Sequence, residues 1–418
     1  MEYRAPRGTR DILPPESEGW DIILSKLTVR AEEYGYKKVI FPTFEHTELF
    51  KRGIGEDTDI VQKEMYTFQD RKGRWLTLRP EGTASLARLF VEKGIDKFNG
   101  VSKYYYFGSM FRYERPQSGR YREFYHFGVE ALGSDSPYLD VELISLCKDT
   151  VESFAIKDYL IYINSIGCSE CRSQYILKLG GLLKQVIAYY CEDCRRRVTT
   201  NTLRVLDCKI DKHRNAELPI LSDNLCPSCS QHYDEVKKGL QTLNINWQEN
   251  PNLVRGLDYY NRTVFELVTP YLGESTSILG GGRYDQLISC LGGKETPGVG
   301  FALGFDRLYQ VVYSNNPDFL NSPRKGVYIS SPETGLWDKV FRITFDLRNR
   351  GLKAECNYQN RSLKSQVKTA DKDNYEFFLT IFQKDMVLKN LTTGEEKVYE
   401  NEEEEKVLVL LSGKGDMS

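Results

Sequence analysis

Apolar residues recur along the chain at two spacings, and these spacings predict where helices and strands lie. From residue 16 to residue 35 they recur at helical spacing and Gly35 follows as a stop signal, which predicts an amphipathic helix. Further helices are predicted at 82–94, 137–155, 283–291 and 304–313. Short runs rich in aromatic and β-branched residues predict strands at 38–41, 74–79, 101–107, 124–132, 159–164, 263–269 and 276–280.

Beyond a predicted linker bracketed by Pro317 and Pro323, strand and helix patterns alternate. Strands are predicted at 326–330, 353–358 and 376–382, and helices at 333–350 and 361–372. That order predicts a small α/β domain with a partly parallel sheet over residues 326–418. We interpret the acidic run at 402–405 as a solvated turn before a last strand at 407–411.

The pattern changes between residues 165 and 250. Seven of the ten cysteines fall there, together with basic clusters and few long apolar runs. We therefore expect an inserted, cysteine-rich domain at 165–250. It would divide the first domain into two parts, 1–164 and 251–322.

Composition and charge exclude some classes of protein. The chain has 418 residues, of which 40% are hydrophobic and 28% charged, and a net charge of −2. These values indicate two or three ordinary globular domains and give no global signal for nucleic-acid binding. No run of 18 apolar residues exists, so no membrane span is expected. The N-terminus lacks the apolar core of a signal peptide, so we expect a cytoplasmic protein.

The cysteines of a cytoplasmic protein are expected to be thiols or metal ligands rather than disulfides. Three Cys-x-x-Cys pairs occur in the inserted segment, and such pairs indicate a tetrahedral site, usually for Zn²⁺. An inserted domain leaves and re-enters its host at neighbouring points, which favours the first and last pairs: Cys168, Cys171, Cys226 and Cys229. Cys191 and Cys194 remain competitors, and reduced cysteines without metal are the alternative.

Residues 111–133 carry an unusual density of arginine. Arg112, Arg115, Arg120 and Arg122 flank a turn between two aromatic, strand-like runs. Guanidinium groups bind phosphate oxygens in pairs and stay charged at every relevant pH, so this hairpin suits a polyphosphate. A solvated, charged hairpin tip is the alternative.

Four other segments carry polar or glycine-rich patterns that suit a ligand site. RPEGTAS (79–85) places Glu81 and Thr83 where a strand becomes a helix; they would either bind a cationic amine or cap the helix. LVRGLDYYNRTVFE (253–266) crowds polar tips onto one loop before a strand. GGGRYDQL (280–287) is interpreted as a flexible glycine turn that starts a helix. TPGVGFALGFDRL (296–308) is not a dinucleotide fingerprint, because no βαβ unit surrounds it.

Taken together and in this order, these segments resemble histidyl-tRNA synthetases, a family of class II aminoacyl-tRNA synthetases. The resemblance covers nearly the whole chain and includes GTRDILPPES (8–17), FPTFEHTELF (41–50) and GIGEDTDIVQKEMYTF (53–68). LVRGLDYYNRTVFE and GGGRYDQL look like the two signatures peculiar to histidine enzymes. The C-terminal α/β domain is similar to the family's anticodon-binding domain.

The resemblance implies an α+β catalytic domain, with an antiparallel sheet flanked by helices, in a homodimer whose interface includes the segment around Pro42. It implies that L-histidine attacks the α-phosphate of ATP, with Mg²⁺ on the outer phosphates, and that the adenylate then acylates tRNA(His). In-line attack at phosphorus depends on positioning and charge neutralisation more than on a covalent catalyst. Carried over to this sequence, Arg112 contacts the α-phosphate, Arg307 the γ-phosphate, and Arg255 the opposite side of the α-phosphate. Phe124 would stack on adenine, with Glu114 near its amino group.

The amino-acid pocket is carried over in the same way. Glu81 and Thr83 match positions that hold the α-amino group, and Glu130, Tyr259 and Tyr260 match the side-chain pocket, which Arg255 also borders. An imidazole offers one donor and one acceptor, so such a pocket needs complementary polar groups. The sequence departs from the family at two positions: His126 replaces a common glutamine beside the substrate, and Asp306 replaces a glutamate.

The rival hypothesis is a synthetase-like regulatory subunit of ATP phosphoribosyltransferase, which would be a binding module. Such paralogues usually lack the C-terminal domain, whereas residues 326–411 resemble a complete one. The intact RPEGT segment and arginines also favour catalysis, and His126 alone leans the other way. Basic residues of the insertion could meet the acceptor arm of tRNA or form a solvated face.

Overall fold

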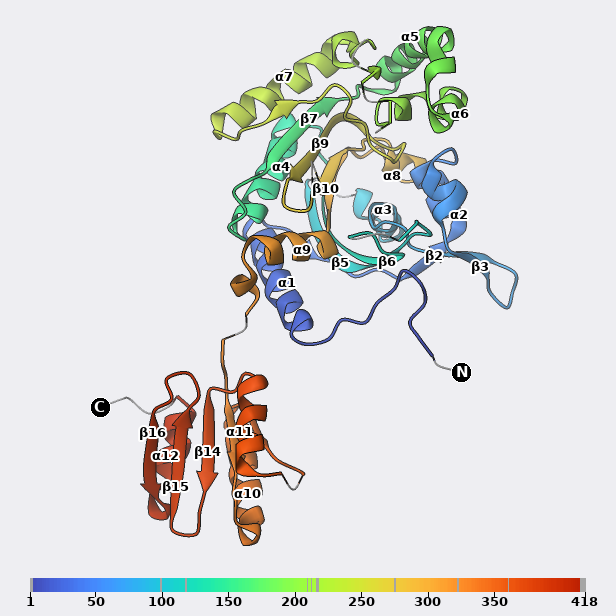
Figure 1. Ribbon diagram of the computed structural model, residues 1–418. Coiled ribbons are helices and arrows are strands. Elements are labelled where there is room, and N and C mark those ends of the chain that lie inside the picture. The colour runs from blue at the N-terminus through green and yellow to red at the C-terminus, as the bar shows by residue number, and fades with distance from the viewer. Residues whose placement is uncertain are drawn as a thin grey trace. The chain divides into compact units, whose positions relative to one another are not determined.

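The computed structural model describes residues 3–97, 100–116, 119–208, 210–211, 213–215, 218–273, 276–321, 323–359 and 361–413. The chain divides into two compact units, Met1–Leu320 and Asn321–Ser418. Each unit contains its own sheet with helices beside it (Figure 1). The residues expected to form a separate inserted domain lie within the first unit.

An eight-stranded sheet forms the centre of the first unit, in the order β1-β5-β6-β11-β10-β9-β7-β8. Its inner strands pair antiparallel, and only the short edge strands β1 and β8 pair parallel to their neighbours. The strands are β1 (Lys37–Lys38), β5 (Ser102–Phe111), β6 (Glu123–Leu132), β7 (Leu160–Ser165), β8 (Gln248–Glu249), β9 (Asn261–Thr269), β10 (Thr276–Arg283) and β11 (Gly298–Gly304). The antiparallel sheet expected from the sequence is confirmed.

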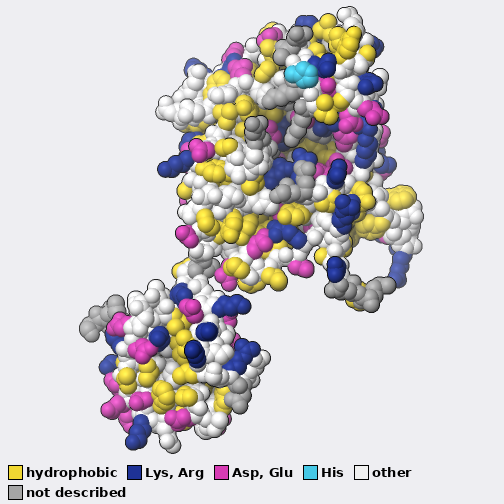
Figure 2. Space-filling view, viewed as in Figure 1, with side chains coloured by type: hydrophobic (Ala, Val, Ile, Leu, Met, Phe, Trp, Pro, Cys, Tyr) yellow, Lys and Arg dark blue, Asp and Glu magenta, His cyan; other side chains and the backbone are white. Residues whose placement is uncertain are grey.

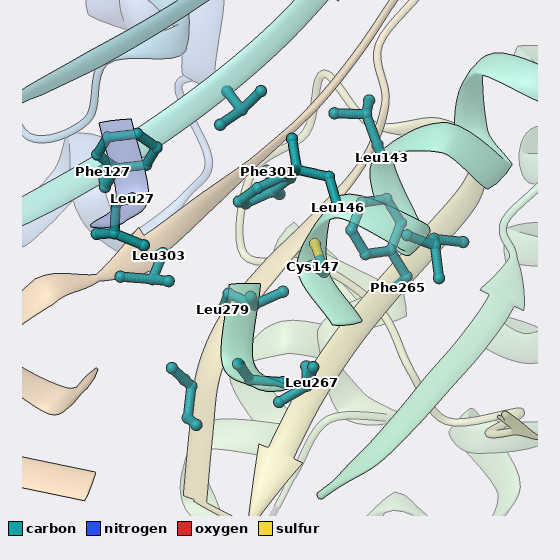
Figure 3. Close-up of a cluster of buried hydrophobic side chains, with 14 of the residues drawn as sticks. Leu27, Phe127, Leu143, Leu146, Cys147, Phe265, Leu267, Leu279, Phe301 and Leu303 are labelled. Atoms are coloured by element: carbon teal, nitrogen blue, oxygen red, sulfur yellow. The ribbon is translucent and has the colours of Figure 1, made fainter. Parts of the chain in front are cut away.

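Alternation along these strands divides the apolar side chains between two layers of helices. Tyr105 belongs to one buried cluster and its neighbour Tyr106 to the other, because successive side chains of a strand point to opposite faces. The first cluster also contains residues of α1 (Glu16–Glu33), α4 (Pro137–Glu152), α7 (Pro227–Thr242) and α9 (Phe305–Asn315). Figure 3 shows part of it, where Phe301 and Phe265 lie beside Leu146, and Phe127 and Leu303 lie beside Leu27.

The second cluster lies on the opposite face of the sheet. It contains residues of α3 (Thr83–Glu92), α5 (Ser169–Val186), α6 (Glu192–Thr200) and α8 (Leu287–Cys290). A smaller sheet in the order β2-β4-β3 lies in the same unit with α2 (Thr47–Ile54). Its strands are β2 (Phe44–His46), β3 (Thr67–Gln69) and β4 (Trp75–Leu78). Short 3-10 or π turns occur at Ile60–Glu64, Ile95–Lys97, Ile187–Tyr189, Thr202–Val205, Ser222–Asn224 and Pro317–Leu320.

The second unit is built on a five-stranded sheet in the order β13-β12-β14-β15-β16. β12 pairs parallel with both neighbours, and the other pairs are antiparallel, which confirms a partly parallel sheet. The strands are β12 (Val327–Ser330), β13 (Ala354–Cys356), β14 (Phe377–Ile381), β15 (Asp385–Asn390) and β16 (Glu396–Glu400). The helices are α10 (Trp337–Asn349), α11 (Leu363–Lys372) and α12 (Glu404–Leu411), with 3-10 turns at Thr334–Leu336 and Asn401–Glu403.

The predicted last strand at 407–411 is wrong, because these residues form the end of α12. Glu400 and Glu403 form a capping box on the 3-10 turn that leads into this helix. Val407, Leu408 and Leu411 are buried, and their spacing places them on one helical face against the core of the second unit. The short apolar run at 407–411 is compatible with a strand or a helix. The capping box before it and the packing of one helical face against the core favour the helix.

The predicted helix at 283–291 is also wrong in its first half. The glycines of the GGGRYDQL segment lie inside strand β10, which continues to Arg283, and the helix covers only Leu287–Cys290. A Cβ at Gly281 would collide with the carbonyl oxygen of Gly300 on the neighbouring strand. These glycines are therefore needed for close strand packing and not for a turn.

Among the described residues, none of the helices combines the length and the apolar character needed to cross a bilayer.

Candidate functional site

A cavity of about 200 Å³ lies over the central strands of the first unit. The side chains of Phe124, His126 and Glu130 on β6 share the strand face opposite to the buried Phe127 and Val129. Lys and Arg side chains also gather near the middle of this unit's face in Figure 2. The cavity is lined by residues from six chain segments, which include Glu81, Thr83, Arg112, Glu114, Phe124, His126, Arg255, Tyr259, Tyr260 and Arg307.

Three arginines from distant parts of the chain meet at this cavity. Arg112 follows β5, Arg255 precedes β9, and Arg307 lies in the first turn of α9. Arg112 is fixed by its Nε, which donates to the carbonyl oxygen of Pro80 at 2.9 Å. Arg307 donates to the carbonyl oxygen of Ser277 at 3.0 Å. The convergence expected from the family resemblance is thus present in the geometry.

Arg255 is positioned by an ion pair with Glu266 and by the space that Gly280 leaves above strand β10. Its guanidinium lies 3.2 Å from the carboxylate of Glu266. A Cβ at Gly280 would overlap this guanidinium, so only glycine at 280 lets the group lie against the strand. Arg255 Nε is buried and lacks a hydrogen-bond partner among the described residues, so the side chain keeps donor capacity for a ligand.

The cavity is electropositive at the end where Arg307 lies. Burial lowers the pKa of Arg307, and the neighbouring charges of Arg120 and Arg112 lower it further. Glu114 opposes this repulsion only in part, at 3.7 Å from Arg120 and 4.0 Å from Arg112. Mutually repelling guanidiniums in one cavity are stabilised by a bound polyanion.

The predicted adenine-binding residues lie next to the arginines. The guanidinium carbon of Arg112 is 5.3 Å from the ring centre of Phe124. The edge of His126 meets the same ring, with 5.0 Å between ring centres and an angle of 68°. Phe124 lines the cavity beside these groups, and an aromatic ring in that position can stack on a purine base.

His126 occupies a buried position beside two positive charges. Burial lowers the pKa of His126 to about 3, and the charges of Arg112 and Arg307 add to this effect. Its imidazole is therefore neutral at pH 7. Nδ1 is buried without a hydrogen-bond partner among the described residues, which leaves one ring nitrogen for a ligand.

The helix-capping role proposed from the sequence is observed for Glu81. The carboxylate of Glu81 accepts hydrogen bonds from the backbone amides of Thr83 at 2.7 Å and Ala84 at 2.9 Å, at the start of α3. Burial raises the pKa of Glu81. The capping role is thus observed, while both residues still line the cavity.

Glu130 lies behind the cavity wall and is not itself a lining residue. Its carboxylate accepts hydrogen bonds from Thr83 at 2.7 Å, Tyr284 at 2.6 Å and Tyr106 at 3.3 Å. Burial raises the pKa of Glu130 to about 8. A Cβ at Gly300 would collide with this carboxylate, so the glycine at 300 makes room for it.

The pocket walls include tyrosines that sequence analysis found only in part. Tyr259 and Tyr260 line the cavity as predicted, and their rings lie 4.7 Å apart. Tyr106, which lines the cavity, and Tyr284, which does not, both donate to Glu130, and both were missed. Nearby glycines were the signal in the sequence that large side chains pack here. A Cβ at Gly82 or Gly128 would overlap the Tyr106 ring, and a Cβ at Gly298 would overlap the Tyr284 ring.

The cysteines form two separate groups. The sulfur atoms of Cys168, Cys171, Cys226 and Cys229 lie within 4.8 Å of one another, which is the grouping favoured by the sequence. Cys191 and Cys194 do not compete for that group, because they lie with Cys208 and Asp211 in a second one. The amide of Cys226 donates to the sulfur of Cys171 at 3.1 Å, which links the two ends of the segment.

A mainly antiparallel sheet with an arginine-lined cavity over its central strands defines the catalytic domain of a class II aminoacyl-tRNA synthetase. The chain matches the family profile described as histidyl-tRNA synthetase over residues 8–169 and 200–308. It is 43% identical over 404 residues to a histidine–tRNA ligase of Acetivibrio thermocellus, covering 95% of this chain and 97% of the relative. A histidine–tRNA ligase of Syntrophomonas wolfei is 44% identical and is covered over 92% of both chains.

The same family appears among solved structures. The fold is similar to apo histidyl-tRNA synthetase of Staphylococcus aureus, with a TM-score of 0.81 and 34% identity over 98% of this chain and 100% of that one. The chain belongs to the histidyl-tRNA synthetase family.

Proposed function

We propose that this chain is a histidine–tRNA ligase, which joins L-histidine to tRNA(His) at the expense of ATP. The observation that carries the proposal is the meeting of Arg112, Arg255 and Arg307 at one cavity beside a buried pocket of hydroxyls and carboxylates. The relatives named above, which match this chain over both units, support the same conclusion. Among the described residues of the site, His126 alone departs from the family in the direction of the regulatory-subunit alternative.

In the first step, a carboxylate oxygen of histidine bonds to the α-phosphorus of ATP. The bond from that phosphorus to the bridging oxygen breaks, and pyrophosphate leaves with Mg²⁺ that entered with ATP. Arg112 and Arg255 would neutralise the charge that develops on the α-phosphate from opposite sides. Arg307 would bind the γ-phosphate, while Phe124 stacks on adenine and Glu114 accepts from its amino group. Catalysis here is positioning and charge stabilisation.

The amino-acid pocket would distinguish imidazole by its hydrogen-bonding groups. Glu81 and Thr83 would hold the α-ammonium, and Tyr259 and Tyr260 would border the ring. Glu130 accepts hydrogen bonds from Thr83, Tyr106 and Tyr284 and would hold these side chains in place, and the oxygen atoms of Thr83 and Tyr106 could then accept from the substrate. A substrate without matching polar groups would leave buried groups unpaired, which is how such a site rejects it.

His126 would act as a neutral neighbour of the reacting groups. Its unpartnered Nδ1 can form one hydrogen bond to the substrate, as the glutamine common in the family would. A neutral ring also adds no positive charge to a pocket that binds an ammonium group.

In the second step, a hydroxyl of the terminal ribose of tRNA attacks the adenylate carbonyl carbon, and AMP leaves. Arg120, on the hairpin loop beside the cavity, would contact the acceptor end; Gln117, which shares that loop, lies outside the described residues. The second unit would bind the anticodon arm, as in the family. Because ribosomes use the product, we place the reaction in the cytoplasm.

The protein would act as a homodimer. Ile40 is 81% exposed, Phe44 50% and Trp75 55%; Ile40 and Phe44 flank Pro42, and Trp75 lies on β4, which pairs with the strand of Phe44. Exposed apolar side chains gathered in this way mark a surface that another chain covers. Light scattering of wild-type protein should give a dimer mass, and F44E together with W75E should shift it toward the monomer.

Zn²⁺ would be bound by Cys168, Cys171, Cys226 and Cys229. Their four sulfurs lie within 4.8 Å of one another, and the Cys168 and Cys171 sulfurs are 3.6 Å apart. Four thiolates at such spacing suit a closed structural site that ties the ends of residues 168–229 together.

The proposed activity predicts ATP–pyrophosphate exchange that depends on histidine and Mg²⁺. It also predicts transfer of labelled histidine to tRNA(His) but not to other tRNAs. Absence of exchange from folded, dimeric protein at saturating histidine would refute the ligase assignment. Exchange without transfer to tRNA would refute only the second step.

A further inference from the structure

The second group of cysteines carries an inference that does not depend on the catalytic activity. Sulfur atoms of Cys191, Cys194 and Cys208 and a carboxylate oxygen of Asp211 lie within 4.8 Å of one another. Cys194, Cys208 and Asp211 are buried, and Cys191 is partly buried. We propose that these four residues hold a second structural Zn²⁺, separate from the site of Cys168, Cys171, Cys226 and Cys229.

The distances suit tetrahedral coordination. A tetrahedral Zn²⁺ with Zn–S bonds of about 2.3 Å separates two sulfurs by about 3.8 Å, and a sulfur and an oxygen ligand by about 3.6 Å. Cys191 and Cys208 have their sulfurs 3.7 Å apart. The sulfur of Cys208 is 3.5 Å from Oδ2 of Asp211. A disulfide would need a sulfur separation of about 2.05 Å, so the group is not one.

The local backbone repeats that of the first group. Cys168, Cys191 and Cys226 each stand at the N-cap of a helix in extended conformation, and the second cysteine of each pair follows in the first helical turn. The positive end of a helix stabilises thiolates at these positions. Two such pairs complete the first group, so the third pair takes its other two ligands from Cys208 and Asp211.

The carboxylate of Asp211 is oriented toward the sulfurs by the backbone. The amide of Cys191 donates to Oδ2 of Asp211 at 3.0 Å, and this is the oxygen next to Cys208. Arg214 lies 3.7 Å from the other oxygen, Oδ1. Oδ2 of Asp211 therefore lies next to three sulfurs, and Asp211 is only 3% exposed. A divalent cation would compensate the buried negative charge of the carboxylate and the thiolates.

The site would fix a segment that touches the catalytic loops. Arg197 donates to the carboxylate of Asp59 at 3.3 Å. Asn201 donates to Asp258 at 3.0 Å. Asp258 stands three residues after Arg255 in the same loop. Both donors lie between the two halves of the proposed ligand set. Loss of the second ion should therefore raise the KM for histidine as a secondary effect, while the metal content reports on the site directly.

The test is the zinc content of full-length protein purified under reducing conditions without added metal. We expect two zinc ions per chain in the wild type, one in Cys208→Ser and one in Cys226→Ser. Cys290→Ser is the matched control, because Cys290 is exposed and belongs to neither group; it should keep both ions. X-ray absorption of the Cys226→Ser protein should show three sulfur ligands and one oxygen ligand on the remaining ion.

Zinc content that Cys208→Ser leaves unchanged, or a disulfide between Cys191 and Cys208 in the purified protein, would overturn the proposal. If Cys208→Ser does not fold, Asp211→Asn keeps all three thiols and provides a second measurement. A chelator should remove one ion from that variant at least about tenfold faster than from wild type, because weakened ligand shells cost about 10–100-fold in metal affinity. Equal release rates would count against the site. Asp223→Asn, at an exposed position, is its control.

Discussion

Replacement of Arg255 by alanine tests the proposed activation step most directly. The wild-type guanidinium is held by Glu266 at 3.2 Å and by the space that Gly280 leaves, so it is fixed before ATP arrives. At about 4 Å from a phosphate charge and an effective dielectric constant of about 20, one such charge contributes about 4 kcal/mol. Loss of one preorganised donor typically costs about 10²–10³-fold in rate. We therefore expect exchange to fall by about 10²–10³-fold.

The fold should survive this change. Glu266 loses its partner, but its side chain is 23% exposed and can be hydrated, so the stability cost should be about 1 kcal/mol or less. The assay is histidine-dependent ATP–pyrophosphate exchange at saturating substrates, with urea unfolding of the same preparation. Arg74→Ala is the matched control, because Arg74 pairs with Asp70 and does not line the cavity.

Two results would refute the reasoning. Exchange within about tenfold of wild type, from folded Arg255→Ala protein, would remove Arg255 from the reacting centre, since the charge argument gives about 10²-fold or more. An equal loss in Arg74→Ala would show that the effect is not specific to the cavity.

Three further substitutions probe the pocket and the fold. His126 has a folded pKa of about 3, so the unfolded state takes up a proton below about pH 6.5 that the folded state does not. Stability should thus fall as pH drops, by about 2 kcal/mol at pH 5, and His126→Gln should remove this part of the loss whereas exposed His46→Gln should not. Urea unfolding at pH 7 and pH 5 measures this loss. If the free energy of unfolding fell equally with pH in wild type and His126→Gln, the result would contradict the prediction. Gly300→Ala should abolish histidine binding by calorimetry, because its Cβ would displace the Glu130 carboxylate. Gly181→Ala, in the interior of α5 with no atom within 4 Å of an added Cβ, should instead stabilise the protein by about 0.5–1 kcal/mol in urea unfolding.

Much of the site was predictable because its residues stand in short segments with distinctive local patterns. The hairpin of β5 and β6 was predicted from two aromatic runs around a basic turn. The structure confirms it and extends the strand pairing to Phe111 and Glu123. The predicted lining residues reach one cavity, while Glu130 lies just behind it. The resemblance supplied the roles, which local pattern alone does not give.

The errors arose where local pattern fits two structures. Gly280 to Gly282 were interpreted as a turn, since glycine is the usual turn former, yet they lie in a central strand. An added Cβ would meet the Arg255 guanidinium at Gly280 and neighbouring backbone oxygens at Gly281 and Gly282. Val407 to Leu411 were interpreted as a strand, since a short apolar run has no clear period, yet the capping box upstream starts a helix.

The sequence by itself determined most of the helices and strands, a separate C-terminal α/β domain, the family and the chemical types available at the site. These follow from residue spacing and short motifs, which act over a few residues. Only the tertiary structure decided that Tyr106 and Tyr284 hold Glu130, that Gly280 seats Arg255, and that seven cysteines divide into two groups with Asp211 in the second. Those facts depend on contacts between segments far apart in the chain, which residue spacing does not encode.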